Sequence, residues 1–303
     1  MKKIIATTTI NPPTQAIGKF QRMEEWDIVV AGDLKTPKEY RLDRGVYLTP
    51  KDQEAISEEL SEAVGWNCIQ RRNFAVIKAY EMGADIIALV DDDNIPYESW
   101  GDNIYIGRPV EVAEYRTEAP AFDPVGATNE SHLWHRGFPL QLLPTRDYST
   151  KATKRIVPDV QAMFWNGDPD IDAICRMEHA PECRFDEACF PMAANRIGPF
   201  NSQNTFISRC IVKDYFLFPH IGRMDDIWAS FYVQAKGARV VYDRPTVYQD
   251  RNVHDLVKDM KQEYLGYENN LNLIRALYDN PDAIFDYLPE ESARAFKIYR
   301  SLF

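Results

Sequence analysis

Short apolar runs alternate with longer amphipathic stretches over the first ninety residues. The pattern predicts strands at 3–8 and 27–31 and helices from Pro13 or Thr14 to about residue 23, at 50–64 and at about 67–82. Within the strand expected at 84–90, the run 86–90 is apolar without a period of two, so it predicts a strand buried on both faces. Such alternation predicts a parallel sheet with right-handed crossovers, an arrangement typical of a nucleotide-binding half.

The pattern changes after residue 94. Residues 96–124 are rich in Pro, Gly and aromatic side chains and show no clear period. Later segments predict strands at 125–127, 156–164, 204–208 and 238–242 and a helix at 225–236, and the chain is mostly helical from 254 onward. No internal repeat or flexible linker is evident, so we expect one compact α/β domain with a helical C-terminal portion.

Three consecutive carboxylates, Asp91, Asp92 and Asp93, follow the buried strand at 84–90 directly. Like charges at the end of a strand repel one another unless a cation lies beside them, and ligands of open α/β sheets bind at this edge. Carboxylate oxygens favour Mg²⁺ or Mn²⁺, which in turn hold a diphosphate. We therefore predict that Asp91 and Asp93 bind the metal as an Asp-x-Asp pair; the alternative is an acidic turn that caps the next element.

Composition limits the class of protein and its partners. The 303 residues include 45% hydrophobic residues, carry a net charge of −11 and contain no apolar run of about 18 residues. We expect a cytoplasmic protein without a membrane span, and the odd count of five cysteines predicts reduced thiols and no zinc site. The acidic charge disfavours broad nucleic-acid binding. A basic segment at 146–155 is the exception, although a solvated loop explains it more simply.

Polar residues after the strands are candidate ligands of a nucleotide. Thr8 and Asp33 follow the first two strands, and at neighbouring strand ends they suit the hydrogen-bonding groups of a uracil base and its ribose. Arg72 lies early in the helix before the acidic triplet, where its guanidinium would reach a diphosphate or pair with a carboxylate. The alternative is that Thr8 and Asp33 only make the hydrogen bonds of a turn.

Further candidates come from the second half of the chain. Arg136, between turn formers, would point into a cleft; Asp168, Asn201 and Gln203 offer groups that hydrogen-bond sugar hydroxyls. Asp226 or Asp225, at a helix start with Asp225 as a plausible N-cap, is a candidate general base. Arg251 and His254 follow the last strand, and His254 would complete the metal shell or contact the diphosphate.

Taken together, these segments resemble a known family. The motifs TTINPPT, GDLKTP, DDDN, RGFPL, GDPDIDAI, PFNSQNT, DDIW and QDRNVHD occur in the order seen in the STELLO family of glycosyltransferase-like proteins, over about residues 7–263. The chain is more distantly similar to the reversibly glycosylated polypeptides, the UDP-arabinopyranose mutases. The resemblance there lies in the Asp triplet, RGFP, CFPMAANRIGPFN and GRMDDIW.

Both resemblances imply a GT-A-type, Rossmann-like nucleotide-sugar-binding sheet flanked by helices, with a UDP-sugar as donor. They imply a nucleotide-binding half at about 1–95, a donor-sugar and acceptor half at about 96–253 and a helical portion at about 254–303. By the same resemblance Arg136 matches the arginine that is glycosylated in the mutases, but Leu143 stands where they carry a second arginine. The membrane anchor and long extra domain of plant STELLO proteins are not expected here.

Three hypotheses follow. The first is a metal-dependent glycosyltransferase that moves a sugar, with a pentose favoured by the mutase kinship, from a UDP-sugar to an acceptor hydroxyl. The second is a UDP-arabinopyranose mutase-like enzyme, and the third is a catalytically silent GT-A-like binding partner. The acceptor stays open between a saccharide, a protein, a small molecule and a modified nucleic-acid base, as does the oligomeric state.

Overall fold

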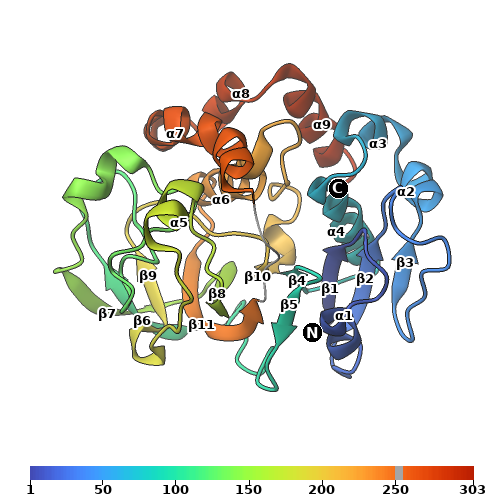
Figure 1. Cartoon of the computed structure of the whole chain (residues 1–303), viewed down its shortest axis with the longest axis horizontal. Helices are drawn as coiled ribbons and strands as arrows, with labels where there is room; N and C mark the ends of the chain where they lie inside the picture. Colours follow the sequence, from blue (N-terminus) through green and yellow to red (C-terminus); the bar gives the residue numbers. More distant parts are fainter. Residues whose placement is uncertain (250–254) are drawn as a thin grey trace.

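One sheet runs through the whole molecule. The computed structural model describes residues 1–249 and 255–303. In this part of the chain eleven strands form a sheet in the order β3-β2-β1-β4-β10-β8-β11-β9-β6-β7, with β5 paired to β11. Figure 1 shows β1, β2 and β3 at one end of the molecule and β6 and β7 at the other. The sheet therefore joins the two halves of the chain.

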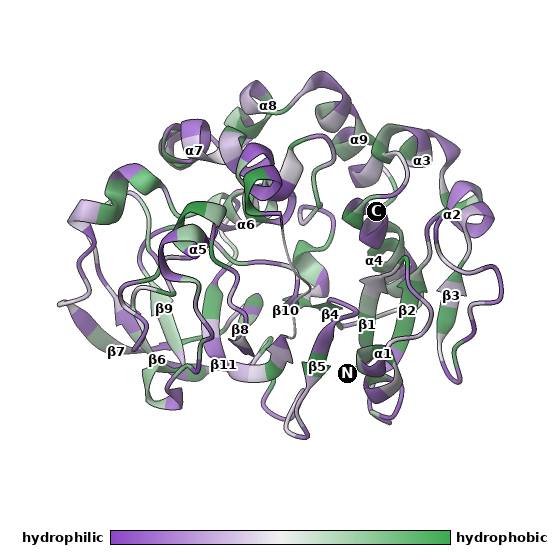
Figure 2. Cartoon of the chain, viewed as in Figure 1, coloured by the Kyte–Doolittle hydropathy of each residue, from purple (hydrophilic) through white to green (hydrophobic). Residues whose placement is uncertain are grey.

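The N-terminal half is parallel, as the sequence predicts. Its strands are β1 (Lys3–Thr8), β2 (Asp27–Ala31), β3 (Val46–Leu48) and β4 (Ile86–Val90). The register places Ile4 opposite both Asp27 and Ile87, and every residue of β4 is buried. The helices are α1 (Gln15–Phe20), α2 (Pro50–Ile56), α3 (Glu58–Val64), η1 (Ile69–Arg71) and α4 (Arg72–Glu81). Helix α4 packs on β1 and β2, and its hydrophobic residues are drawn green in the ribbon of Figure 2.

The second half is mixed. It contains β5 (Asn94–Pro96), β6 (Val110–Tyr115), β7 (Lys151–Ile156), β8 (Val160–Gly167), β9 (Met192–Ala194), β10 (Asn204–Ser208) and β11 (Val240–Gln249). Its helices are η2 (Leu140–Thr145), α5 (Ala173–His179), η3 (Glu187–Cys189), η4 (Arg209–Ile211), η5 (Gly222–Met224) and α6 (Asp225–Ala235). Strand β10 runs antiparallel to β4 and β8, whereas β8 and β11 are parallel. The predicted α/β fold class is confirmed, with a parallel first half and a mixed second half joined in one sheet.

The C-terminal helices lie across both halves along one side of the sheet (Figure 1). They are α7 (Leu256–Asp279), η6 (Pro281–Ala283), α8 (Ile284–Tyr287) and α9 (Glu290–Arg300). Helix α7 contacts η5, α5 and α6, while α9 packs on α3. Among the helices of the described residues, none has the length and apolar character required to cross a membrane.

Several local predictions differ from the structure. The helix expected at 50–64 is broken at Ser57, whose extended backbone ends α2 and whose hydroxyl accepts from Leu60 N to begin α3. Residues 125–127 form turns, and the strand expected at 156–164 is divided between β7 and β8 around Pro158. Residues 151–155 of the basic segment, for which a loop is the simpler expectation, belong to β7 because they pair with β6. Asp225 is the first helical residue of α6, and Met224 occupies the N-cap position.

Candidate active site

A cavity of about 500 Å³ lies beside the carboxyl end of β4, where residues far apart in the sequence meet. Its lining comes from η1, the end of β4, the segment before β10, η5, the start of α6, the end of β11 and α7. Six residues predicted from the sequence line it: Asp91, Asp93, Arg136, Gln203, Asp225 and Asp226. The tertiary structure therefore gathers six of the fourteen sequence candidates into one site.

The three carboxylates of the acidic triplet lie in two different surroundings. Asp91 and Asp93 line the cavity. Asp92 instead accepts hydrogen bonds from the Thr9 hydroxyl and from Asn11 Nδ2, the latter at 3.1 Å. The first and third carboxylates of the triplet therefore line the cavity, and the second is held by the segment after β1.

Arg72 anchors Asp91 from behind. Its guanidinium is fully buried and pairs with Asp91 Oδ1, and Nη1 donates to Ser202 O at 2.7 Å and to Ser202 Oγ at 2.8 Å. Burial raises the pKa of the Asp91 carboxyl, and the charge of Arg72 acts in the opposite direction. Of the two roles considered for Arg72, the structure places it with the acidic cluster.

Arg136 is buried in the wall of the cavity with all five of its N–H groups satisfied. Nε and Nη2 donate to Asp170 at 2.8 and 2.9 Å, Nη1 and Nη2 donate to Asp226 at 3.0 and 3.3 Å, and Nη1 also donates to Arg223 O. Burial disfavours the charged guanidinium, but the two carboxylates outweigh it and raise the pKa of Arg136 well above its usual value. Arg136 is therefore a permanently charged cross-link.

Asp225 and Asp226 are adjacent but chemically different. Asp226 accepts from Arg136, from Ser202 N at 2.9 Å and from Ser202 Oγ at 3.1 Å. Asp225 accepts from Gln70 Nε2 at 2.8 Å. Burial, assisted by the charge of Asp226, raises the pKa of Asp225 to about 7. A carboxylate with a pKa near neutrality suits general-base catalysis, so Asp225 fits that role better than Asp226.

A second arginine enters the cavity from η5. Arg223 donates from Nε to Glu263 Oε1 at 2.8 Å and lies 3.8 Å from Asp259. Helix α7, which carries both carboxylates, approaches closely because Gly222 has φ +61° and a Cβ there would lie 2.2 Å from Gln262 O. The close contact between η5 and α7 thus fixes the position of the Arg223 side chain.

The remaining described candidates lie outside the cavity lining. The strand ends that precede Asp33 and contain Thr8 are adjacent, because Thr8 lies opposite Ala31, and the Thr8 hydroxyl donates to Ala31 O at 2.7 Å. Asp33 accepts from Leu34 N at 2.6 Å, from Asn67 N at 2.8 Å and from Cys68 N at 3.1 Å. This carboxylate therefore holds the turn that leads into η1.

Two other candidates are held by neighbouring side chains. Asp168 pairs with Arg176, and Asn201 donates to Asp170 Oδ2 at 2.9 Å. Arg251 and His254 fall outside the described residues.

Four residues of the site were missed by the sequence interpretation: Gln70, Asp170, Ser202 and Arg223. Asp170 had a visible signal, because it stands in the same acidic turn as Asp168. Arg223 directly precedes the acidic pair at the start of α6. Ser202 stands between the candidates Asn201 and Gln203 in the same polar run. Gln70 carries no such signal, since its role depends on a contact with Asp225, which is 155 residues away in the sequence.

The donor groups suit a divalent ion that is shared with a ligand. Among the described residues no cluster of three or more His, Cys, Asp or Glu side chains is arranged to hold a metal alone. Two carboxylates, Asp91 and Asp93, do line the cavity, and Mg²⁺-type sites use one or two carboxylates together with water and substrate phosphates. Cys68 is a poor candidate for such chemistry because burial raises its pKa to about 11.

Comparison with known proteins confirms the resemblance found in the motifs. The chain is 21% identical over 313 residues to the probable glycosyltransferase STELLO2 of Arabidopsis thaliana, which covers 94% of this chain and 40% of that protein. It is 21% identical over 223 residues to the probable glycosyltransferase STELLO1 of the same plant, with 67% and 29% covered. The chain thus spans less than half the length of these curated relatives. No family model matches it.

Two solved structures are similar at 11% sequence identity. Glucosyl-3-phosphoglycerate synthase from Mycobacterium tuberculosis, in complex with phosphoglyceric acid, has a TM-score of 0.45 and covers 89% of this chain and 80% of its own. Residues 1–349 of TarS from S. aureus, in complex with UDP-GlcNAc, give a TM-score of 0.42 with 100% and 90% covered.

Proposed function

We propose that this chain, which resembles the STELLO glycosyltransferases along 94% of its length, transfers a sugar from a UDP-sugar to an acceptor hydroxyl. The observation that carries the proposal is the cavity itself. It combines the carboxylates that follow a buried parallel strand, Asp91 and Asp93, with a carboxylate whose pKa lies near 7, Asp225. The first pair suits a metal-bound diphosphate, and Asp225 suits proton removal from an acceptor.

The charge of the cavity supports a metal ion, Mn²⁺ or Mg²⁺. Four aspartates line it, against the guanidinium groups of Arg136 and Arg223. A diphosphate entering this surface would meet net repulsion unless a divalent cation bound with it. We propose that Asp91 and Asp93 hold that ion, with Arg72 keeping Asp91 in place. When bound, the ion would neutralise charge on the departing UDP.

The protein's own residues would then act in defined ways. Asp225 would accept the proton of the acceptor hydroxyl while Gln70 orients its carboxylate, as an inverting transferase requires. Arg223, held by Glu263, would contact the diphosphate. Arg136 would keep Asp226 and the segment at Ser202 in position. We propose a pentose as the donated sugar because of the motifs shared with the mutases.

The mutase-like alternative is less well supported. Attack by an arginine on the sugar needs a neutral, accessible guanidinium nitrogen, whereas Arg136 has five satisfied donors and a raised pKa. Displacing Asp170 and Asp226 would leave two buried carboxylates without their cation. A catalytically silent partner would not need a carboxylate with a pKa near 7, such as that of Asp225.

The first experiment measures thermal unfolding with UDP, with and without Mn²⁺. Ligand at about 100 times its Kd should stabilise the protein by about 2.7 kcal/mol. We expect the Mn²⁺-dependent part of the shift to disappear in Asp93→Ala and to persist in Asp102→Ala, which removes an exposed aspartate. An equal shift without Mn²⁺, or in Asp93→Ala, would argue against the metal.

The second experiment incubates the protein with a panel of UDP-sugars and Mn²⁺ and follows the products by chromatography and mass spectrometry. Slow release of UDP and free sugar from one donor is expected for a transferase without its acceptor. Conversion of UDP-arabinopyranose to the furanose form, together with a sugar adduct on Arg136, would establish the mutase instead. No turnover of any donor would favour the silent partner.

A further inference from the structure

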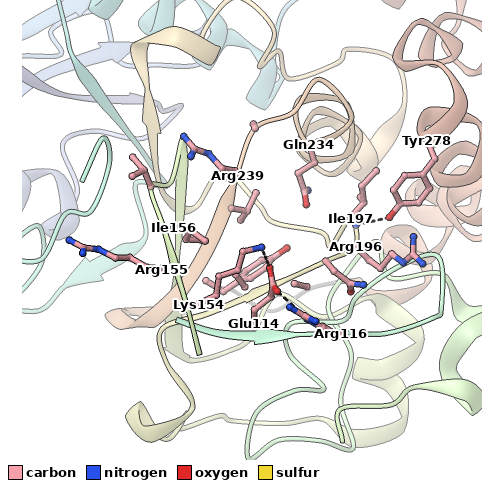
Figure 3. A pocket seen from close by; sticks show the side chains of 17 residues that line it. Glu114, Arg116, Lys154, Arg155, Ile156, Arg196, Ile197, Gln234, Arg239 and Tyr278 are labelled. Carbon is pink, nitrogen blue, oxygen red and sulfur yellow. Dashed lines mark hydrogen bonds and ion pairs between the residues drawn. The ribbon is translucent and has the colours of Figure 1, made fainter. Parts of the chain in front are cut away.

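A second and larger cavity, of about 830 Å³, lies on the far part of the sheet. Its lining comes from β6, β7, β9, the last turn of α6, the start of β11 and the end of α7 (Figure 3). The short side chains of Ala193 and Ala194 on β9 leave the hollow open. This cavity is distinct from the candidate active site in both position and charge.

The length of helix α6 gives the separation of the two cavities. Asp226, in its first turn, lines the candidate active site, whereas Gln234, in its last turn, lines the second cavity. Eight residues of α-helix span about 12 Å. Strand β11 separates the sites in the same way, since Val240 at its start lines the second cavity and Gln249 at its end lines the first.

The second cavity is strongly basic. Five cations line it: Arg116, Lys154, Arg155, Arg196 and Arg239. The only carboxylate in the lining, Glu114, is buried between Lys154 and Arg116, and Asp159 outside the lining pairs with Arg239 at 3.1 Å. Even with both carboxylates counted, three positive charges remain in excess, in a chain whose net charge is −11. An anion is therefore attracted to this cavity and repelled by most of the remaining surface.

The cations are arranged for an extended anion. The side chains of Arg116, Lys154 and Arg239 are 58%, 51% and 53% exposed, and these residues lie just after β6, within β7 and just before β11. Compact phosphate sites use backbone N–H groups at a helix N-terminus, but α6 points its C-terminal end at this cavity. Exposed cations spread over a wide hollow are typical of contacts to successive backbone phosphates.

An aromatic ring stands at the same rim. Tyr278 is 43% exposed, and its hydroxyl is fixed because it accepts from Ile197 N and donates to Pro120 O, both at 2.8 Å. Figure 3 shows this ring beside Arg196, whose guanidinium carbon lies 5.8 Å from the ring centroid. A rigid, partly exposed ring next to a cation is a platform on which an unpaired base stacks.

We propose that this cavity binds a single-stranded nucleic-acid segment, with its phosphates on cations of the lining and a base stacked on Tyr278. The site is independent of the transferase reaction. It explains why the basic residues at 151–155, which the reaction does not use, are held on a strand at the edge of the sheet. A strand bound there would lie within about 12 Å, along α6, of the candidate active site.

The test is fluorescence anisotropy with a labelled single-stranded oligonucleotide of about 20 nucleotides, over a series of salt concentrations. Three neutralised phosphates predict a slope of log affinity against log salt of about −2. Inorganic pyrophosphate at matched ionic strength is the competitor. Displacement no greater than that by salt alone supports the proposal, and displacement at micromolar pyrophosphate would overturn it in favour of a small phosphate ligand.

Charge variants locate the site. The double variant Arg116→Gln/Arg155→Gln leaves Lys154 paired with Glu114, so the fold is retained. It should lower affinity roughly tenfold at low salt and reduce the magnitude of the slope by about 1.4. The matched control Lys35→Gln/Lys38→Gln removes the same charge from exposed positions after β2, near the other end of the sheet. Equal affinity in the two double variants, or no binding by the wild type at low salt, would overturn the proposal.

Tyr278 tests the stacking contact separately. Tyr278→Leu should weaken binding roughly tenfold with the salt slope unchanged, because a leucine has no π face. Tyr278→Phe keeps the ring and removes only the hydroxyl, so it should bind as the wild type does. Equal loss in both variants would show that the hydroxyl anchors, and not the ring, matter, which would contradict stacking.

Discussion

Arg136 holds the wall of the candidate active site together through two ion pairs. Its guanidinium joins Asp170 on one side to Asp226 on the other, and each carboxylate is 0–6% exposed at its side chain. Removing the cation would leave two buried negative charges close together. The residue therefore acts as a cross-link between the turn before α5 and the first turn of α6.

Arg136→Met should lower the free energy of unfolding by about 3–5 kcal/mol, because it removes the partner of buried carboxylates. Urea denaturation measures this change. Arg22→Met, at an exposed position, is the control and should change stability by less than about 0.5 kcal/mol. A loss in Arg136→Met as small as that of the control would mean that the carboxylates are protonated or hydrated in its place.

Asp225 sets the expected pH dependence of the proposed transfer. Its pKa of about 7 means that the proton-accepting form is populated as pH rises, so the rate should increase through a midpoint near 7. Asp225→Asn should lower the rate by about 10²–10⁴-fold without weakening UDP binding.

Gln70→Leu provides a second measurement of the same role. The hydrogen bond from Gln70 favours the charged carboxylate, so its loss should move the midpoint of the pH profile to higher pH. An unchanged midpoint would show that another group, such as Asp226, accepts the proton.

At the scale of elements, the contact between η5 and α7 shapes the cavity. Gly222→Ala places a Cβ 2.2 Å from Gln262 O and also strains a backbone with φ +61°. Gly237→Ala is the matched control, because its φ of +98° is equally unsuited to alanine but no atom lies within 4 Å of its Cβ. Both variants should be destabilised by about 1 kcal/mol or more through the backbone. Only Gly222→Ala should also weaken UDP binding; equal binding in both would contradict this role of the contact.

At the scale of the whole molecule, buried acids link stability to pH. Burial raises the pKa of Asp172, the N-cap of α5, to about 7. Because this folded-state pKa lies above the value in the unfolded chain, the stability that Asp172 contributes is present below about pH 4 and is lost as pH rises to about 7.

Asp172→Asn removes this dependence. The difference in free energy of unfolding between Asp172→Asn and the wild type should therefore change in favour of the variant, by at most about 1.4 kcal/mol per pH unit between about pH 4 and 7. Urea denaturation over that range measures it. A difference that stays constant with pH would show that Asp172 is ionised throughout.

The sequence by itself determined the parallel half of the fold and the position of the acidic triplet. An apolar run without alternation, such as Ile86–Val90, predicts a strand buried on both faces because both of its faces are apolar, and every residue of β4 is buried. The break between α2 and α3 was not predicted, because it depends on the cap formed by the Ser57 hydroxyl. The edge strand β7 was not predicted either, because it depends on pairing with β6.

Only the tertiary structure decided which polar residues share a cavity and what each can do there. Asp225 and Asp226 look alike in the sequence. In the structure Asp226 accepts hydrogen bonds from Arg136 and Ser202. Asp225 instead accepts from Gln70, and burial raises its pKa. Likewise, Arg116 and Arg239 lie more than 100 residues apart and meet only because β6, β9 and β11 are neighbours in the sheet. Charge and pKa depend on distances through space, which the order of residues along a chain does not contain.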